Sequence, residues 1–138
     1  MKNTKARSFV AIMIALAVSS LLLRIAIEKI IKINISQNES NAQTTLKLIS
    51  TAIENYAQDH LGVFPVNLSV LTQNHPPYLD KDYIAQTPLK GYNYSCPRFE
   101  PSGYSCSAIP VKCQLTGKMI YTITTGGLLI SEECSKKE

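Results

Sequence analysis

The residues of this chain that could carry covalent or metal chemistry are mainly its four cysteines. Cys96, Cys106, Cys113 and Cys134 all lie in the last third of the sequence. An even number of cysteines in a small polar domain favours disulfide bonds formed in an oxidising compartment. Structural zinc sites usually draw ligand pairs about two to four residues apart. Nine, six and twenty residues separate these cysteines, so the spacing favours disulfides over zinc.

The pairing of the cysteines stays open at this point, because four cysteines allow three connectivities. We favour Cys96 with Cys106 and Cys113 with Cys134. Each of these bonds would close a nearby hairpin or hold down the C-terminal part of the chain. Such bonds would compensate for the small core of the domain that contains them.

Candidate catalytic residues are few. A nucleophile needs a neighbouring histidine and an orienting acid, and the chain has two histidines, His60 and His75. We interpret His60 as a favourable charge at a helix C-terminus and His75 as a surface loop residue. Asp80 and Asp82 could offer oxygens to calcium, which takes about six to eight oxygen ligands. Two acids on a loop are more often solvated charges, so we expect no enzyme, metal or cofactor.

The net charge of +4 is concentrated at the N-terminal end. Residues 1–33 hold six basic residues and one acidic residue, whereas the rest of the chain sums to −1. Nucleic-acid binding depends on clustered Lys and Arg that neutralise phosphates. Here the basic residues flank an apolar run, as the charges beside membrane helices do. We therefore expect no nucleic-acid partner.

The apolar run covers residues 9–23 without a charge. As a helix it would be about 22 Å long, which is short for a hydrocarbon core of about 30 Å. Arg24 can extend its side chain toward the membrane surface, and the isoleucines that follow prolong the segment to residue 33. A cleaved secretory signal would need a small-x-small site, which LLLRIAIEKIIKI lacks. We expect residues 9–33 to cross a membrane once, and the cysteines place the C-terminal part outside the cytoplasm.

An amphipathic helix follows, because apolar residues recur at three- and four-residue steps up to about residue 60. They are Ala42, Leu46, Ile49, Ile53 and Tyr56. Neither Pro nor Gly interrupts residues 9–60, so a single helix of 52 residues is possible. The polar stretch at residues 34–41 is the expected break in it.

Gly62 and Pro65 end the helix, and residues 61–90 are expected to form a packed loop. Alternating runs at residues 92–96, 104–109, 119–125 and 128–131 predict antiparallel strands. The pair Gly126 and Gly127 fits a two-residue hairpin turn.

The expected fold class is α+β: a long N-terminal helix, hydrophobic and then amphipathic, packed on a small antiparallel sheet of three or four strands. Residues 1–8 form a basic leader-like tail and residues 9–33 a membrane-spanning helix. Residues 34–138 form an outer globular domain, with its sheet within residues 91–134.

The order of these parts resembles type IV pilins and type II secretion pseudopilins. The likeness rests on a short basic leader, a phenylalanine that opens an apolar helix, and a helix that continues into the segment NESNA. Downstream, TLKLISTAIENYAQDHLGVFPVNLSVLT is similar to the pseudopilin helix followed by a glycine and an aromatic-Pro step. The segments PPYLDKDY, KGYNYSC and TGKMIYTITTGG resemble the loop and sheet of small prepilin-type proteins.

This resemblance implies a pilin-like fold and a structural subunit, minor or diverged, of a type IV pilus-like or type II secretion pseudopilus filament. The implied partners are other pilin-like subunits bound through their N-terminal helices, the inner-membrane assembly platform, the prepilin peptidase and membrane lipid. The chain would be a single-pass protein of the bacterial inner membrane, with its outer domain in the periplasm or on a cell-surface filament. The alternative is a non-polymerising, single-pass anchored domain that binds a partner outside the cytoplasm.

The resemblance also implies cleavage between Ser8 and Phe9 and N-methylation of the new N-terminal Phe9. It further implies a filament-core helix that includes Phe9, Met13 and Arg24. Two residues depart from the family pattern. Family leaders usually end in glycine, whereas Ser8 precedes Phe9. Most members carry a glutamate at the fifth mature position, where this chain has Met13. The loss of that carboxylate indicates altered assembly, because a charge in lipid is costly without a partner.

Overall fold

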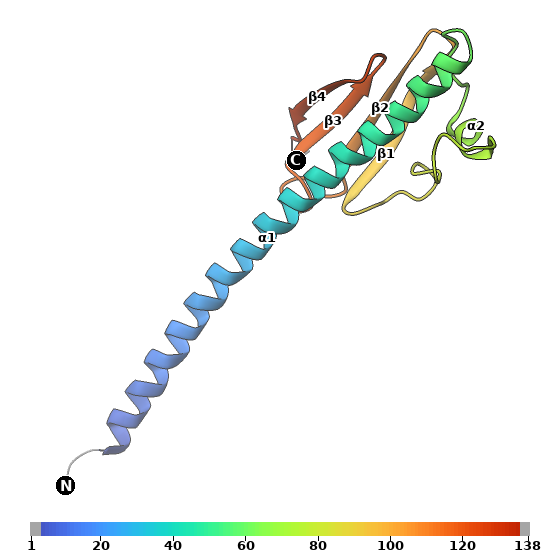
Figure 1. The fold of residues 1–138 in the computed structure, drawn as a ribbon. Coiled ribbons are helices and arrows are strands. Elements are labelled where there is room, and N and C mark those ends of the chain that lie inside the picture. Colours follow the sequence, from blue (N-terminus) through green and yellow to red (C-terminus); the bar gives the residue numbers. More distant parts are fainter. Residues whose placement is uncertain (1–3, 136–138) are drawn as a thin grey trace. The chain divides into compact units, whose positions relative to one another are not determined.

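The computed structural model describes residues 4–135, with side chains from Ser8 onward. Of the expected leader-like tail at residues 1–8, only Ser8 therefore has a described side chain. The elements in chain order are α1 (Thr4–Asp59), α2 (Leu68–Gln73), β1 (Tyr92–Glu100), β2 (Gly103–Pro110), β3 (Met119–Thr124) and β4 (Leu128–Glu133) (Figure 1). The expected α+β class, a long N-terminal helix with a small antiparallel sheet, is confirmed.

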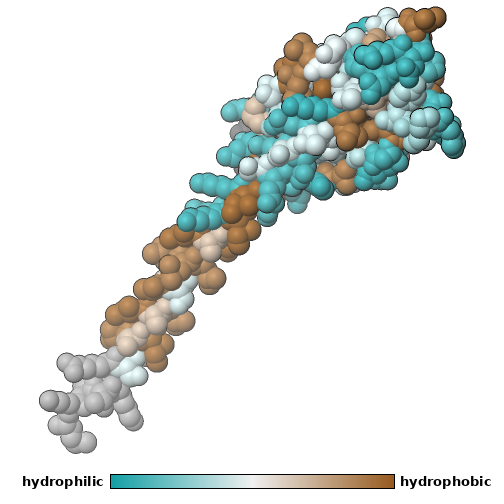
Figure 2. Space-filling model, in the orientation of Figure 1, coloured by the Kyte–Doolittle hydropathy of each residue, from teal (hydrophilic) through white to brown (hydrophobic). Residues whose placement is uncertain are grey.

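The described residues form two compact units, one that ends at Asn34 and one that begins at Ile35. In the first unit, residues 8–30 of α1 are exposed on every side, and Phe9 for example keeps 65% of its surface exposed. Figure 2 shows this part of the helix covered by hydrophobic side chains. A candidate membrane span begins at Ser8, with a mean hydropathy of 2.5 over 18 residues and none of that window buried. By length and composition, the helix can cross a membrane.

The polar stretch at residues 34–41 is helical, so the expected break is wrong. Two of its polar side chains, those of Asn38 and Glu39, bind backbone groups of the loop between β2 and β3. The Asn38 amide donates to the Thr116 carbonyl at 2.9 Å, and the Glu39 carboxylate accepts from the Lys118 N–H at 2.8 Å. These two bonds tie the helix to the loop and stabilise the helical form of the stretch.

The second unit buries one face of α1 against the sheet. Ala42, Leu46, Ile49 and Ile53 are fully or almost fully buried, as the apolar spacing predicts, whereas Tyr56 is only partly buried. The sheet and the segment after α1 supply the other side of this core. The buried residues from these elements are Leu68, Leu71, Leu79, Tyr92, Tyr94, Tyr104, Cys106, Ala108, Tyr121 and Ile123.

The segment between α1 and β1 contains the short helix α2, where the sequence analysis expected only loop. Asn67 caps this helix, and its side chain accepts from the Val70 N–H at 3.1 Å. Leu68 and Leu71 are buried and anchor α2 to the core. An asparagine directly before an apolar pair is a helix-start signal, so the sequence did contain an indication of α2.

The sheet is antiparallel with the order β1-β2-β3-β4. The β3–β4 turn differs from expectation, because three residues, not two, lie between the paired Thr124 and Leu128. The physical reason is Thr125, whose hydroxyl accepts from the Tyr104 N–H at 2.9 Å and so is engaged outside the turn. Gly126 and Gly127 then complete the reversal with φ of 83° and 73°, a region that favours glycine.

The structure joins Cys96 to Cys106 and Cys113 to Cys134, the pairing that the sequence analysis favoured. The first bond crosslinks the neighbouring strands β1 and β2, with a sequence separation of 10. The second has a sequence separation of 21 and ties the residue after β4 to the loop before β3.

Breaking either disulfide is expected to lower the free energy of unfolding by about 2 to 5 kcal/mol, because the unfolded chain gains freedom. Replacing Cys113 and Cys134 together with serine should cost about 0.7 kcal/mol more than replacing Cys96 and Cys106, because the first bond closes the longer loop. Urea denaturation in detergent, with and without reductant, measures both effects. Unchanged stability in reductant would contradict this expectation.

The substitution Ile49→Asp should unfold the second unit, because it places an unpaired charge between helix and sheet, where Ile49 has no exposed surface. We expect a loss of more than about 3 kcal/mol. Leu48→Asp is the matched control, because Leu48 precedes Ile49 and is 44% exposed. This variant should lower the free energy of unfolding by less than about 1 kcal/mol. Circular dichroism during urea titration compares the two. Equal losses would show that the helix face is wrongly assigned.

Candidate assembly surface

The apolar part of α1 is the largest candidate functional surface among the described residues. It carries the predicted positions Phe9, Met13 and Arg24, all of which are exposed. At about 100° per residue these three fall within roughly 60° of one another around the helix. The helix therefore aligns them on one face without bringing their side chains together.

Two serines lie within this apolar surface, and both have internal hydrogen-bond partners. The Ser19 hydroxyl donates to the Ala15 carbonyl at 2.6 Å, and the Ser20 hydroxyl donates to the Ala17 carbonyl at 2.8 Å. A hydroxyl bonded to its own helix needs no water. The surface can therefore be covered by lipid or by another apolar helix without leaving these groups unpaired.

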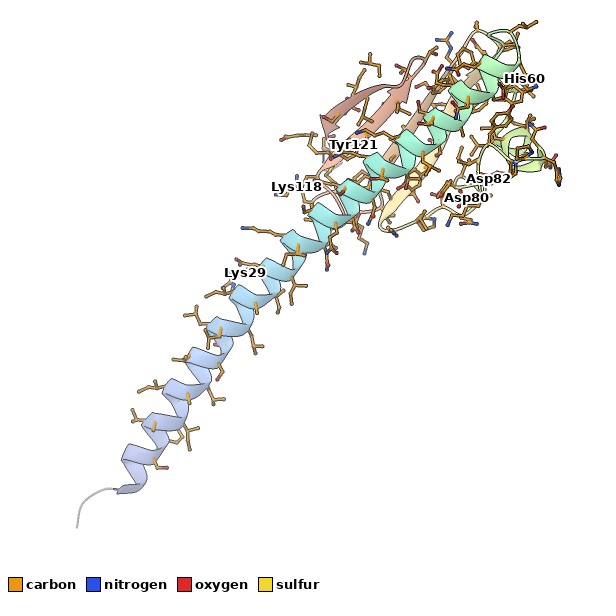
Figure 3. All side chains as sticks on the ribbon, viewed as in Figure 1. Lys29, His60, Asp80, Asp82, Lys118 and Tyr121 are labelled. Atoms are coloured by element: carbon orange, nitrogen blue, oxygen red, sulfur yellow. A yellow bond between two sulfur atoms is a disulfide. The ribbon has the colours of Figure 1, made fainter. Side chains whose placement is uncertain are left out.

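The two histidines lie at the end of α1 and in the loop that follows it. His60 follows the last residue of α1 (Figure 3), and its Nδ1 is 2.8 Å from the Tyr56 carbonyl oxygen. Its ring stacks on that of Tyr56, with centroids 3.8 Å apart. His75 is exposed and lines a shallow pocket with Asp59, whose carboxylate accepts from the Tyr78 hydroxyl at 2.6 Å. The contacts of His60 with Tyr56 stabilise the C-terminal end of α1, and the bond between Tyr78 and Asp59 holds the following loop against it.

Asp80 and Asp82, which the sequence analysis weighed as calcium ligands, accept hydrogen bonds within their own loop (Figure 3). Asp80 accepts from the Tyr83 hydroxyl at 3.0 Å. Asp82 accepts from the N–H groups of Ile84 and Ala85 at 2.9 and 3.0 Å, which fixes a local turn. Within residues 4–135, no three His, Cys, Asp or Glu side chains gather as a metal site would require.

A partly buried polar network, which the sequence analysis missed, links α1 to the sheet. The Ser50 hydroxyl lies 2.7 Å from the Tyr104 hydroxyl, which donates to the Glu54 carboxylate at 2.9 Å. The same Glu54 oxygen accepts from the Gly126 N–H at 2.7 Å and so holds the β3–β4 turn against the helix. Its signal is the pair Ser50 and Glu54, four residues apart beside an apolar face.

The pKa values of six tyrosines in the second unit are raised, in most of them mainly because burial disfavours the charged form. Desolvation, with a smaller contribution from Glu54, raises the pKa of Tyr104 from 10.0 to about 12. Desolvation is also the largest cause of the raised pKa of Tyr92. For Tyr78 the largest cause is its hydrogen bond to Asp59. The pKa values of three further tyrosines are also raised from 10.0, in each case mainly by desolvation: Tyr83, Tyr94 and Tyr121.

These shifts predict that the second unit loses stability in alkali. A tyrosine with a raised pKa in the folded state keeps its proton where the unfolded chain has released it. The stabilisation is therefore complete below pH 10.0, the usual tyrosine value, and falls as the pH rises toward about 12. Urea midpoints between pH 9 and 11.5 should show this decline. Tyr104→Phe should flatten its slope, and an unchanged slope would show that Tyr104 titrates normally.

Comparisons with known proteins add a fold relationship. Neither a protein-family model nor a curated protein sequence matches the chain. Among solved structures, the non-core minor pilin PilV of Neisseria meningitidis matches with a TM-score of 0.50 and 18% identity, covering 78% of this chain and 94% of that one. At this identity the likeness concerns the fold alone. It confirms the expected architecture: a long N-terminal helix and a four-stranded antiparallel sheet that together make a pilin-like fold.

Proposed function

We propose that this protein is a structural subunit, minor or diverged, of a type IV pilus-like or type II secretion pseudopilus filament, and that it is not an enzyme. The observation that supports this proposal most strongly is the uncharged stretch of α1 at residues 9–23, which is apolar on every side and exposed. A helix that is hydrophobic all round must be buried by lipid or by other helices. A filament subunit would be covered by lipid before assembly and by neighbouring helices after it.

The two possible covers of the helix suit the two stages of a subunit's life. Before assembly, residues 9–33 span about 37 Å as a helix, enough to cross the hydrocarbon core of about 30 Å. After assembly, the same side chains pack against the N-terminal helices of neighbouring subunits. Burial of apolar surface stabilises that packing by about 25 cal/mol per Å² where the surface would otherwise face water.

The second unit supports a place outside the cytoplasm. Its two disulfide bonds fit an oxidising compartment. We therefore place the outer domain in the periplasm or on a cell-surface filament, with the helix anchored in the bacterial inner membrane. As a filament subunit the chain would have the assembly platform and a prepilin peptidase as partners, and the peptidase would cut between Ser8 and Phe9.

The alternative function is a single-pass anchored domain that binds a partner and never polymerises. Two residues favour it. Ser8 replaces the glycine before the cleavage point, and Met13 replaces the glutamate that would pair with the amine of a neighbouring subunit. Among the described side chains, no carboxylate lies on α1 before Glu28, so an assembling subunit would have to be held by apolar contacts there.

Intact-mass and N-terminal analysis of the membrane-bound protein, from a host with an active prepilin peptidase, separates the two functions. We expect a chain that begins at N-methylated Phe9. The variant Ser8→Gly is the matched control, because it restores the family residue at the cleavage point. If Ser8→Gly is processed and the natural chain keeps residues 1–8, the anchored domain is the better assignment.

Helix packing can be measured separately, because no cysteine precedes Cys96. Leu16→Cys, in the middle of the apolar surface, should form crosslinks between copies or with co-expressed pilin-like subunits under mild oxidation. Lys47→Cys, at an exposed position of the second unit, is the control for random collision. Crosslinking of Lys47→Cys as fast as of Leu16→Cys would argue against packing through the N-terminal helix.

A further inference from the structure

The two edges of the sheet are built differently, and one of them is closed. Along β1, Leu89 exchanges backbone bonds with Tyr92 at 2.8 and 3.1 Å. The next outward N–H, that of Tyr94, donates to the Thr87 hydroxyl at 2.8 Å. Beyond it, the register shifts around Pro97, which has no N–H to offer. These are devices by which proteins prevent strand addition at an edge.

The other edge, β4, is open within the described residues, because β3 is its only neighbour (Figure 1). The Cys134 N–H donates to the Lys118 carbonyl at 2.8 Å. This bond sets the phase of the antiparallel ladder, in which hydrogen-bonded and non-bonded pairs alternate. Leu129, Ser131 and Glu133 therefore point their N–H and C=O groups away from β3. These three alternating residues therefore offer backbone hydrogen-bond donors and acceptors to another strand.

Apart from the two glutamates at its end, strand β4 lacks the features that usually protect an edge. Its register with β3 is regular from Met119↔Glu133 to Thr124↔Leu128, and its sequence LLISEE contains neither Pro nor Lys. Leu128 and Ile130 lie on the sheet face away from α1 and remain 61% and 52% exposed. A regular, exposed, apolar edge strand is a template for pairing with another chain.

The charge of β4 indicates what kind of segment would fit. Glu132 and Glu133 end the strand, and the ion pair found among the described residues joins Arg98 to Glu100 instead. A strand added antiparallel places its N-terminal end opposite these acids. A second copy of this chain fits less well, because a two-fold pairing centred on Ile130 sets Glu132 opposite a leucine.

We propose that β4 receives an extended segment of a partner protein as a fifth antiparallel strand, and that this segment alternates apolar and polar residues and is basic at its N-terminal end. The backbone bonds supply affinity, while Leu128, Ile130 and the two glutamates select the sequence. This inference does not depend on the filament role, since an anchored binding domain would use the same edge.

The test uses the full chain in detergent micelles and a synthetic peptide, acetyl-Lys-Lys-Thr-Val-Thr-Val-amide, whose valines lie opposite Ile130 and Leu128 when its lysines lie opposite Glu132 and Glu133. Hydrogen exchange read residue by residue by NMR should slow by at least about tenfold at the outward amides of Leu129, Ser131 and Glu133. The amides of Leu128 and Ile130 already bond to β3 and should change little. This alternation distinguishes strand addition from nonspecific adsorption, which would protect both sets or neither.

Substitutions make the test specific. Ser131→Pro removes an outward N–H that β3 does not use, so it should abolish peptide binding, while Ser131→Val keeps the N–H and should bind. Thermal unfolding checks that both variants fold. Glu132→Lys combined with Glu133→Lys should weaken binding at least tenfold and transfer the preference to a peptide that begins Glu-Glu.

Three outcomes would overturn the proposal. The first is no alternating protection at millimolar peptide. The second is equal binding by a folded Ser131→Pro variant. The third is protection of the outward amides that grows with protein concentration without peptide, which would assign the edge to a second copy. If Ser131→Pro does not fold, the alternating exchange pattern and the charge exchange decide the matter in its place.

Discussion

The second unit depends on the contact between one face of α1 and the sheet. Ile49, Ile53 and Leu46 have no exposed surface, and they face tyrosines whose hydroxyls must be paired because they are buried. Tyr104 bonds to Ser50 and Glu54, and Tyr92 donates to the Met119 carbonyl at 2.8 Å. The core is thus apolar in its centre and polar where the helix meets the turns, which fixes how the helix and the sheet fit together.

The sequence predicted the parts of the fold that periodicity controls. The three- and four-residue spacing identified the buried face of α1, and alternation identified all four strands, although β1, β2 and β4 are longer in the structure than predicted. It failed where a side chain bonds to a distant backbone. The contact of Asn38 with Thr116 keeps the polar stretch helical, and that of Thr125 with Tyr104 reshapes the last turn. Such long-range bonds leave no periodic trace in a sequence.

The candidate assembly surface was predictable for a different reason. An uninterrupted apolar run needs no tertiary information to be recognised, so Phe9, Met13 and Arg24 could be placed on an exposed helix from the sequence alone. The β4 edge could not, because whether an edge is open depends on what the rest of the chain covers. Leu89 and Thr87 close the β1 side, and only the folded arrangement shows that no described segment does the same for β4.

The bond between Cys113 and Cys134 has a mechanical consequence. Strand β4 is fastened at both ends: at its start by the turn that Glu54 holds through Gly126, and at its end by the disulfide. A hairpin strand normally frays from its free terminus, one ladder bond at a time. Here the covalent link removes that free end, so a pulling force on β4 must load its ladder bonds in parallel, and the strand resists peeling as a single piece.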